Sequence, residues 1–303
     1  MVVNKFPKFI PPENYLFKTL TMKKLFTFIL LLAGITVCCI SQHSKLNIIV
    51  IGAHPDDCDV IAGGTAILYS KFGHNVKFVS MTNGDAGHQS MGGGVLAKRR
   101  MLEAQEAGKR FGVEYMVMDN HDGELMPTLE NRLKIIREIR NWKADIVITH
   151  PPDDYHPDHR YTSILVQDAS YMVIVPNVAP DTPPLKKNPV FLYPGFSSPE
   201  IAIDIDAVFD QKVYATSAHE SQFFEWMPWT EGALDKVPSG REERLKFVAG
   251  WFSPVNESEK SCLKKWYGEI KGNKVIYAET FRYTPYGRKP SEEESRKLFP
   301  MIK

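Results

Sequence analysis

The amino-acid sequence predicts an α/β fold in which a mostly parallel sheet is covered by helices on both faces. One observation behind this prediction is the continuous apolar run Leu46–Gly52, which is typical of a strand buried on both sides. Another is the regular alternation of strand and helix patterns over residues 46–149, which is typical of parallel strands joined by helices. The chain has 303 residues, of which 43% are hydrophobic, and this is enough for one substantial core.

The elements of the first half follow one another with short connections. Residues 59–73 carry a helical pattern of apolar side chains that ends at Gly73. The predicted order then continues with the strand Val76–Met81, a helix at about 95–111 that ends at Gly112, the strand Tyr115–Met118, a helix at about 129–142 and the strand Asp145–Thr149.

The second half of the sequence is much richer in proline and does not continue the regular alternation of strand and helix patterns. Prolines interrupt the chain after Val175 and exclude a continuous helix there; they stand at positions 176, 180, 183, 184, 189, 194 and 199. Beyond them the sequence predicts strands at Val190–Tyr193 and Glu200–Ile205, a helix from Asp206 to about Phe224, a loop at 225–240, helices at about 241–252 and 257–268, and a final strand at Lys274–Tyr283. We interpret this half as an extension of the same domain, so that residues 42–303 form one catalytic domain.

Residues 1–41 have the character of an export signal. Met22-Lys23-Lys24 is followed by the apolar segment Leu25–Val37 and then by Cys38-Cys39-Ile40-Ser41. The apolar segment is shorter than the roughly 20 residues that cross a bilayer, so cleavage is expected, and residues 1–21 then lie upstream of the true start. Uncleaved anchoring and lipidation of a cysteine are the alternatives. We therefore expect a periplasmic or extracellular protein without a stable transmembrane anchor after cleavage.

The charge of the mature chain argues against a nucleic-acid partner. Removal of residues 1–41 takes away five lysines and one glutamate, so the formal net charge changes from +1 to −3. Only Cys58 and Cys262 remain, which is too few for a disulfide framework and leaves no thiolate cluster for a closed structural zinc site.

Side chains that bind metals follow two of the predicted strands. His54, Asp56 and Asp57 come directly after the first strand, and a second group follows the strand Asp145–Thr149: His150, Asp153, Asp154, His156, Asp158 and His159. The carboxyl ends of parallel strands meet at one edge of a sheet, so both groups are expected to face one crevice. Asp and Pro are also common turn formers, but turns do not require four histidines.

The chemistry of these residues suits a catalytic zinc, which takes three nitrogen or oxygen ligands from the protein and keeps one position open for water. The spacing of His54 and Asp57 places two ligands on one metal from a tight turn and leaves Asp56 beside the metal. Of His156 and His159, one serves as the third ligand and the other as a proton donor.

Four motifs occur in a fixed order over about residues 46–225: Ala53-His54-Pro55-Asp56-Asp57, Gly63-Gly64, Thr82-Asn83-Gly84-Asp85 and His156-Pro157-Asp158-His159. Together they closely resemble the PIG-L/LmbE-like family of zinc-dependent N-acetylglucosaminyl deacetylases. The resemblance implies a Rossmann-like α/β fold and hydrolysis of an amide on an amino sugar or its conjugate.

The resemblance also implies roles for single residues. The implied zinc ligands are His54, Asp57 and His159, the general base is Asp56, and His156 is the general acid or electrostatic stabiliser, oriented by Asp158. The implied substrate-binding residues are Arg100, which matches the family's arginine, Asp122 as a sugar-contacting acid, Tyr155 beside the position of a tyrosine that assists some relatives, and His219. The family often has Glu where this chain has Asp59.

Two features allow a structural interpretation as well. His219 belongs to a pattern running from Lys212 to Gln222 that either lies near the pocket or packs a helix on the sheet. The aromatic residues at 223–229 either stack on sugar rings or, as is more usual, form core or a lid.

The sequence thus predicts an exported zinc hydrolase that removes an N-acetyl group from a GlcNAc-containing glycan or conjugate, with Fe²⁺ or Co²⁺ as other suitable metals. The alternatives are an amidase acting on a larger N-acyl or thiol-sugar conjugate and an inactive glycan-binding relative. A dinucleotide-binding domain is disfavoured, because the first strand leads to His-Pro-Asp-Asp and not to a glycine-rich turn. The glycan and the oligomeric state are not determined by the sequence.

Overall fold

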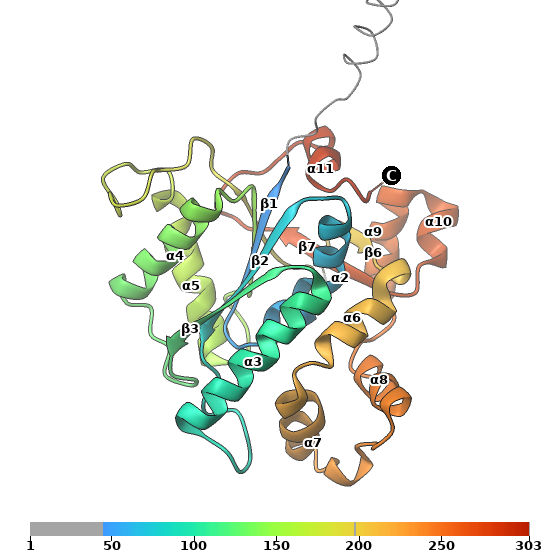
Figure 1. The fold of residues 1–303 in the computed structure, drawn as a ribbon. Coiled ribbons are helices and arrows are strands. Elements are labelled where there is room, and N and C mark those ends of the chain that lie inside the picture. The colour runs from blue at the N-terminus through green and yellow to red at the C-terminus, as the bar shows by residue number, and fades with distance from the viewer. Residues whose placement is uncertain (1–44, 197, 303) are drawn as a thin grey trace, which may run out of the picture. The chain divides into compact units, whose positions relative to one another are not determined.

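The computed structural model describes residues 45–196 and 198–302, and these form a seven-stranded sheet flanked by helices (Figure 1). The strand order is β3-β2-β1-β4-β5-β7-β6. The strands are β1 (Asn47–Gly52), β2 (Asn75–Thr82), β3 (Glu114–Asn120), β4 (Ile146–Thr149), β5 (Val190–Pro194), β6 (Ile201–Asp204) and β7 (Ala278–Tyr283). The predicted α/β fold with a mostly parallel sheet is confirmed. The expected export signal lies outside the described residues.

The first five strands are parallel, and β7 is antiparallel to both of its neighbours. Strand β1 lies at the centre and alternates its apolar side chains between two cores. Ile48 and Val50 face the core on one side of the sheet, whereas Ile49 and Ile51 face the core on the other. A strand buried on both faces cannot expose a polar side chain until it ends, so the first polar residues of this segment come in the turn that follows.

The helices form a layer on each face (Figure 1). Helices α4 (Leu129–Trp142) and α5 (Pro157–Met172) cover the face of Ile49 and Ile51. The other face is covered chiefly by α2 (Asp57–Lys71), α3 (Gly93–Phe111), α6 (Phe209–Thr216) and α9 (Glu257–Tyr267). The remaining helices are α7 (Met227–Thr230), α8 (Arg241–Ala249), α10 (Glu269–Lys274) and α11 (Glu292–Leu298), with short 3-10 turns at Asp206–Val208 (η1) and Leu234–Lys236 (η3).

Three expectations for the second half are wrong in detail. The helix predicted from Asp206 to Phe224 is broken: α6 ends at Thr216, and a π-helix, η2, occupies Gln222–Trp226. The predicted loop 225–240 contains α7 and η3. The last strand begins at Ala278 and not at Lys274, because Gly268, at φ 82°, turns the chain into the short helix α10.

Helix α2 is irregular at Ala62, whose φ is −144° and ψ is 17°. The backbone groups that this break frees are bound by two buried side chains from the second half. The Lys212 ammonium donates to the Val60 carbonyl at 2.9 Å, and the Glu279 carboxylate accepts from the N–H groups of Gly64 and Thr65 at 2.7 Å each. Lys212 and Glu279 also pair with each other at 2.7 Å. Strand β7 and helix α6 thus hold the first turn of α2 in place.

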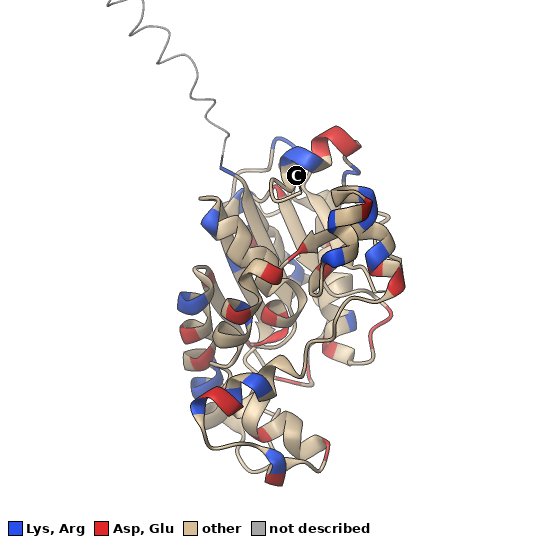
Figure 2. Ribbon diagram, turned by 90° about the vertical axis from the view of Figure 1, so that its right-hand side faces the viewer, with Lys and Arg blue, Asp and Glu red and all other residues tan. Residues whose placement is uncertain are grey.

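Lys, Arg, Asp and Glu are interspersed along the helices on the side shown in Figure 2. Several of them pair across one helical turn, as Arg110 does with Glu106 and Lys297 with Glu293. Within the described residues, no helix combines the length and the apolar character that a membrane span needs. Cys58 and Cys262 are both buried and free.

Candidate active site

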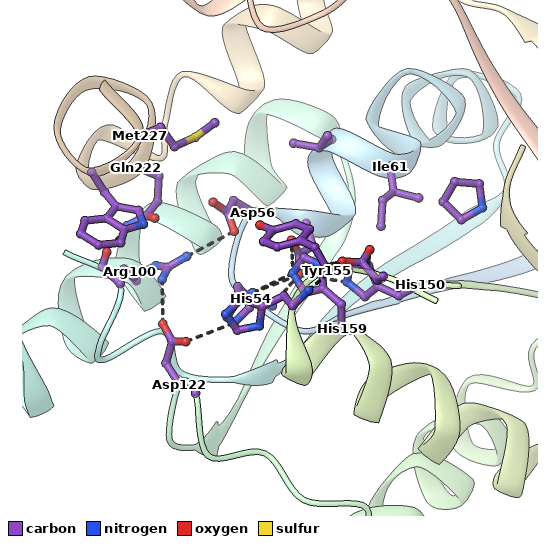
Figure 3. Close-up of a pocket in the computed structure, with 18 of the residues that line it drawn as sticks. His54, Asp56, Ile61, Arg100, Asp122, His150, Tyr155, His159, Gln222 and Met227 are labelled. Carbon is purple, nitrogen blue, oxygen red and sulfur yellow. Dashed lines mark hydrogen bonds and ion pairs between the residues drawn. The ribbon is translucent and has the colours of Figure 1, made fainter. Parts of the chain in front are cut away.

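A cavity of about 570 Å³ lies beyond the carboxyl ends of β1 and β4, and its size is typical of a small-molecule site (Figure 3). Eight of the ten residues that the sequence singled out line it: His54, Asp56, Asp57, Arg100, Asp122, Tyr155, His156 and His159. The other two, Asp158 and His219, lie behind its wall. Both polar groups of the sequence therefore meet in one crevice, as expected.

The turn after β1 is closed by its own carboxylate. Asp57 Oδ2 accepts the backbone N–H groups of Ala53 at 2.9 Å and His54 at 2.7 Å. Gly52 makes this tight return feasible, because a Cβ atom there would lie 2.7 Å from the Cβ of Asp57. The turn thus fixes the His54 and Asp57 side chains on the same side of the chain, with Asp56 between them.

His54, Asp57 and His159 converge on one point. His54 Nδ1 lies 3.1 Å from His159 Nε2 and 3.5 Å from Asp57 Oδ2, and His159 Nε2 lies 3.5 Å from Asp57 Oδ1. Tetrahedral zinc with ligands at 2.0–2.2 Å requires neighbouring ligand atoms to be about 3.3–3.6 Å apart. The spacing and the nitrogen–oxygen donor set therefore fit such a metal. Three groups of possible metal-binding side chains overlap with this set: His54 with His156 and His159, Asp57 with His150 and His159, and His54 with Asp122 and Asp158.

The second nitrogen of His54 faces two carboxylates. His54 Nε2 lies 3.1 Å from Asp122 Oδ1 and 3.4 Å from Asp158 Oδ2. Burial by itself lowers the pKa of His54, but these carboxylates and Asp57 hold that pKa well above its usual value. A carboxylate on the far side of a ligating imidazole fixes the ring and increases its basicity, so this arrangement suits a metal on Nδ1.

Asp158 was expected to orient His156, and the structure shows a different contact. Its side chain is almost fully buried, accepts the backbone N–H groups of Gly123 at 2.7 Å and Leu125 at 3.2 Å, and faces His54. Asp158 is the second residue of α5, and its side chain points back to the 121–125 loop. That direction depends on how β3 and α5 pack.

His159 and His150 are held by a second carboxylate and by stacking. Asp154 Oδ1 lies 2.9 Å from His159 Nδ1, on the side of the ring away from the cluster. The His150 ring stacks on His159 with centroids 4.0 Å apart, and its Nε2 lies 3.1 Å from Asp57 Oδ2. Burial tends to raise the pKa of Asp57, but the imidazoles of His159 and His150 hold it well below its usual value.

Arg100 links Asp56 to Asp122 in the wall of the cavity (Figure 3). Its Nη2 donates to Asp56 Oδ1 at 3.2 Å, and its Nη1 donates to Asp122 Oδ2 at 3.5 Å and to the Gly84 carbonyl at 3.2 Å. Gly84, at φ 72°, leaves the room that the guanidinium needs, since a Cβ there would lie 2.6 Å from it. Burial raises the pKa of Asp56, while the Arg100 charge acts in the opposite direction.

His156 and Tyr155 lie on the other wall of the cavity. His156 caps α5, and its Nδ1 accepts the N–H of Asp158 at 3.2 Å. The neutral ring then carries its proton on Nε2, where it can donate to an oxygen atom of a ligand. Burial and the neighbouring His54 charge lower the pKa of His156. Tyr155 is 84% exposed, and its ring centroid lies 5.4 Å from that of His159.

His219 was expected to contact substrate, but in this structure its side chain is fully buried. Its Nε2 lies 3.0 Å from Asp59 Oδ1, and the Tyr115 hydroxyl donates to Asp59 Oδ2 at 2.9 Å. Burial lowers the pKa of His219, but Asp59 keeps it above its usual value. Asp59, the shorter acid of the motif, is thus engaged behind the cavity.

Comparison with known proteins agrees with this geometry. A family model described as "PIG-L: GlcNAc-PI de-N-acetylase" matches residues 49–170. Diacetylchitobiose deacetylase from Thermococcus kodakarensis is 29% identical over 253 residues, which cover 79% of this chain and 83% of the relative. The predicted resemblance to the PIG-L/LmbE family of deacetylases is confirmed.

Two further matches extend over most of this chain. A probable N-acetyl-α-D-glucosaminyl L-malate deacetylase from Bacillus cereus is 28% identical over 218 residues, covering 68% of this chain and 96% of the relative. A solved structure of N,N'-diacetylchitobiose deacetylase from Pyrococcus horikoshii superposes with a TM-score of 0.60 at 25% identity, covering 78% of this chain and 83% of that one.

Sequence reasoning missed two supporting residues of this site. Asp154 and His150 were seen in the polar group after β4 but received no role. The only sign of a contact in the sequence is that Asp154 stands five residues before His159, so that a turn between them can bring the two side chains together. Gln222 and Trp226 of η2 also line the cavity, so the aromatic segment at 223–229 contributes to the wall as well as to the core.

Proposed function

We propose that this protein is a metal-dependent deacetylase that hydrolyses the N-acetyl group of a GlcNAc-containing glycan or conjugate. The observation that carries the proposal is the convergence of His54, Asp57 and His159 with Asp56 beside them and held by Arg100. The names of the relatives, which act on diacetylchitobiose or on N-acetylglucosaminyl malate, support the class of substrate.

The donor set of His54, Asp57 and His159 would hold zinc, or Fe²⁺ or Co²⁺, which suit the same ligands. Four buried or half-buried carboxylates, those of Asp57, Asp122, Asp154 and Asp158, surround the imidazoles, and a divalent cation offsets their charge. When bound, such a metal lowers the pKa of a water molecule and polarises the amide carbonyl.

The protein's own side chains supply the proton transfers. Asp56 accepts the proton of the attacking water and hands it to the amine that leaves. Arg100 fixes the orientation of the Asp56 carboxylate and keeps one of its oxygens engaged. The Nε2–H of His156 donates to the carbonyl oxygen as negative charge develops there, which stabilises the transition state. The products are a free amine and acetate.

The test is a screen for acetate release from GlcNAc, its oligosaccharides and N-acetylglucosaminyl conjugates, with and without a chelator. We expect acetate from at least one of these substrates, loss of the activity with the chelator and its return with zinc. A parallel set with larger N-acyl groups separates deacetylation from a broader amidase activity. Hydrolysis of only the larger amides would overturn the proposal.

We also propose that the protein is exported, on the basis of the signal-like segment at Met22–Gln42. Expression of the full chain in a bacterial host should yield a mature protein in the periplasm or medium whose first residue lies near position 42. N-terminal sequencing of that protein checks the proposal, and a mature chain that still begins at Met1 or Met22 contradicts it.

A further inference from the structure

A second cavity continues from the candidate active site and has no part in the chemistry proposed above. Its volume is about 320 Å³, and we call it the outer groove. It is lined mainly by Asp153, Tyr155, Phe196, Ser198 and Arg282. Tyr155 and Phe196 line both this groove and the active-site cavity, so the two spaces join at these rings. A ligand held at the metal ligands can therefore extend into the groove.

Both shared rings are exposed. Tyr155 is 84% exposed and Phe196 is 60% exposed. Single exposed apolar side chains are common on protein surfaces, but these two border one cavity that leads to the catalytic residues. Aromatic rings of this kind bury the apolar face of a ligand and leave its polar edge in water.

Phe196 is also held in an unfavourable backbone conformation. Its φ is 38°, in the left-handed region that a bulky side chain rarely adopts. The residues around it fix this shape: Gly195 donates its N–H to the Thr280 carbonyl at 2.7 Å, and Ser198 donates to the Gly195 carbonyl at 2.9 Å. The fold thus bears a conformational cost to present an apolar ring to solvent, and burial of that ring does not offset it.

The rest of the groove is polar. Arg282 extends from β7 over the Tyr193 ring, and its Nη2 lies 3.8 Å from Asp153 Oδ1. This separation is longer than a hydrogen bond, so the donors of Arg282 and the acceptors of Asp153 remain available for hydroxyl groups. Ser198 also lines the groove. Two rings with a guanidinium and a carboxylate match a sugar, which has an apolar face and a rim of hydroxyls; an acyl chain would leave these polar groups unpaired.

We propose that the outer groove is a sugar-binding subsite, which holds a second unit of a substrate whose N-acetyl group lies at the metal ligands. The preferred substrate is then an oligosaccharide or a sugar glycoside and not GlcNAc alone. This inference rests on the proposed deacetylase function and specifies its substrate.

The first experiment compares kcat/KM for acetate release from GlcNAc and from its β-linked di-, tri- and tetrasaccharides. We expect kcat/KM to rise with chain length. Arg282→Ala should lower kcat/KM for the oligosaccharides about ten-fold, which corresponds to the loss of a hydrogen bond to a charged group. It should change kcat/KM for GlcNAc less than about two-fold. The matched control is Arg132→Ala, which removes a half-buried arginine paired with Asp168 on the α4–α5 surface. An equal loss on every substrate, or no dependence on chain length in the parent protein, overturns the proposal.

Phe196→Gly separates a binding role from a structural one. Glycine adopts φ 38° without cost, so this change should leave the melting temperature unchanged or raise it while the gain from chain length is lost. A lower melting temperature with an intact gain means that Phe196 is structural, and overturns its role in the subsite. A larger N-acylglucosamine, such as the N-hexanoyl derivative, is the competing ligand: if Arg282→Ala and Phe196→Gly impair its hydrolysis alone, the groove binds acyl chains.

A binding measurement keeps the two proposals distinguishable. Calorimetric titration of the tetrasaccharide and of GlcNAc into the Asp56→Asn protein, with and without Arg282→Ala, does not depend on turnover. Tighter binding of the tetrasaccharide that is weakened about ten-fold by Arg282→Ala supports the subsite even if no acetate is ever released. Equal affinity for the two sugars overturns the subsite while leaving deacetylation of GlcNAc intact.

Discussion

The two ends of the active-site space are built differently. At the inner end, the side chains of His54, Arg100 and Asp122 are only 11%, 3% and 9% exposed, and Asp122 contacts the other two. At the outer groove, Tyr155 and Phe196 are largely exposed and Arg282 keeps unused donors. Bond breaking requires groups fixed to within fractions of an ångström, whereas selection of a long substrate requires an open surface. The contrast indicates that the inner end carries the chemistry and the outer end the selectivity.

The largest effect is expected from the loss of a metal ligand. His159→Ala removes the side chain that lies close to both His54 and Asp57. We expect the purified variant to lose bound metal and all measurable acetate release. Elemental analysis of the desalted protein checks this, with His121→Ala, an exposed histidine, as the control. Normal metal content in the His159→Ala protein contradicts the ligand assignment.

Replacement of the base should spare the metal. Asp56→Asn keeps the shape of the side chain and its contact with Arg100 but cannot accept a proton. We expect kcat to fall by about 10²–10⁴-fold, with the metal content unchanged. Single-turnover acetate release measures this step directly. Turnover within ten-fold of the parent protein would assign the role of base to another group.

The next largest effect is expected on stability, from loss of the buried Lys212–Glu279 pair that binds the backbone of α2. Lys212→Met leaves the buried Glu279 carboxylate without its cation, which costs about 3–5 kcal/mol of the free energy of unfolding for a buried pair. Urea denaturation measures the loss. The control is Lys297→Met, since the Lys297–Glu293 pair is exposed and its loss should leave the free energy of unfolding nearly unchanged. A loss as small as that of the control means that the pair does not stabilise the kink in α2.

The smallest effect is expected on metal affinity, and it should differ between two neighbouring residues of one turn. Asp154 contacts His159, whereas Asp153 is 80% exposed and faces the outer groove. Asp154→Asn should weaken metal affinity by about 10–100-fold, because it removes the carboxylate that orients a ligand. Asp153→Asn should leave metal affinity unchanged. Competition with a chelating dye gives both values, and similar values for the two variants would remove the distinction between the two ends.

The sequence allowed prediction of the features that depend on local pattern. The strand before His54, the position of Asp56 and the meeting of the two polar groups all follow from apolar runs and from the rule for parallel sheets. The direction of β7 could not be predicted, because an apolar strand has the same pattern whether it runs parallel or antiparallel.

The contacts of Asp158 and His219 were beyond sequence reasoning for another reason. Each depends on a partner from a distant part of the chain: the backbone of Gly123 for Asp158, and Asp59 for His219. A motif shows that a carboxylate and an imidazole stand at certain positions. It does not show which ring a carboxylate will face once three separate elements have packed together.

The kink in α2 has a consequence for dissecting this chain. All the proposed ligands and proton carriers lie between residues 54 and 159, and the family model ends at residue 170. Yet the turn that carries His54 and Asp57 leads into a helix whose broken backbone is bound by Lys212 and Glu279. A fragment that stops at residue 170 would contain the whole motif and still lack the groups that shape it. The smallest piece able to act as an enzyme must therefore extend through β7.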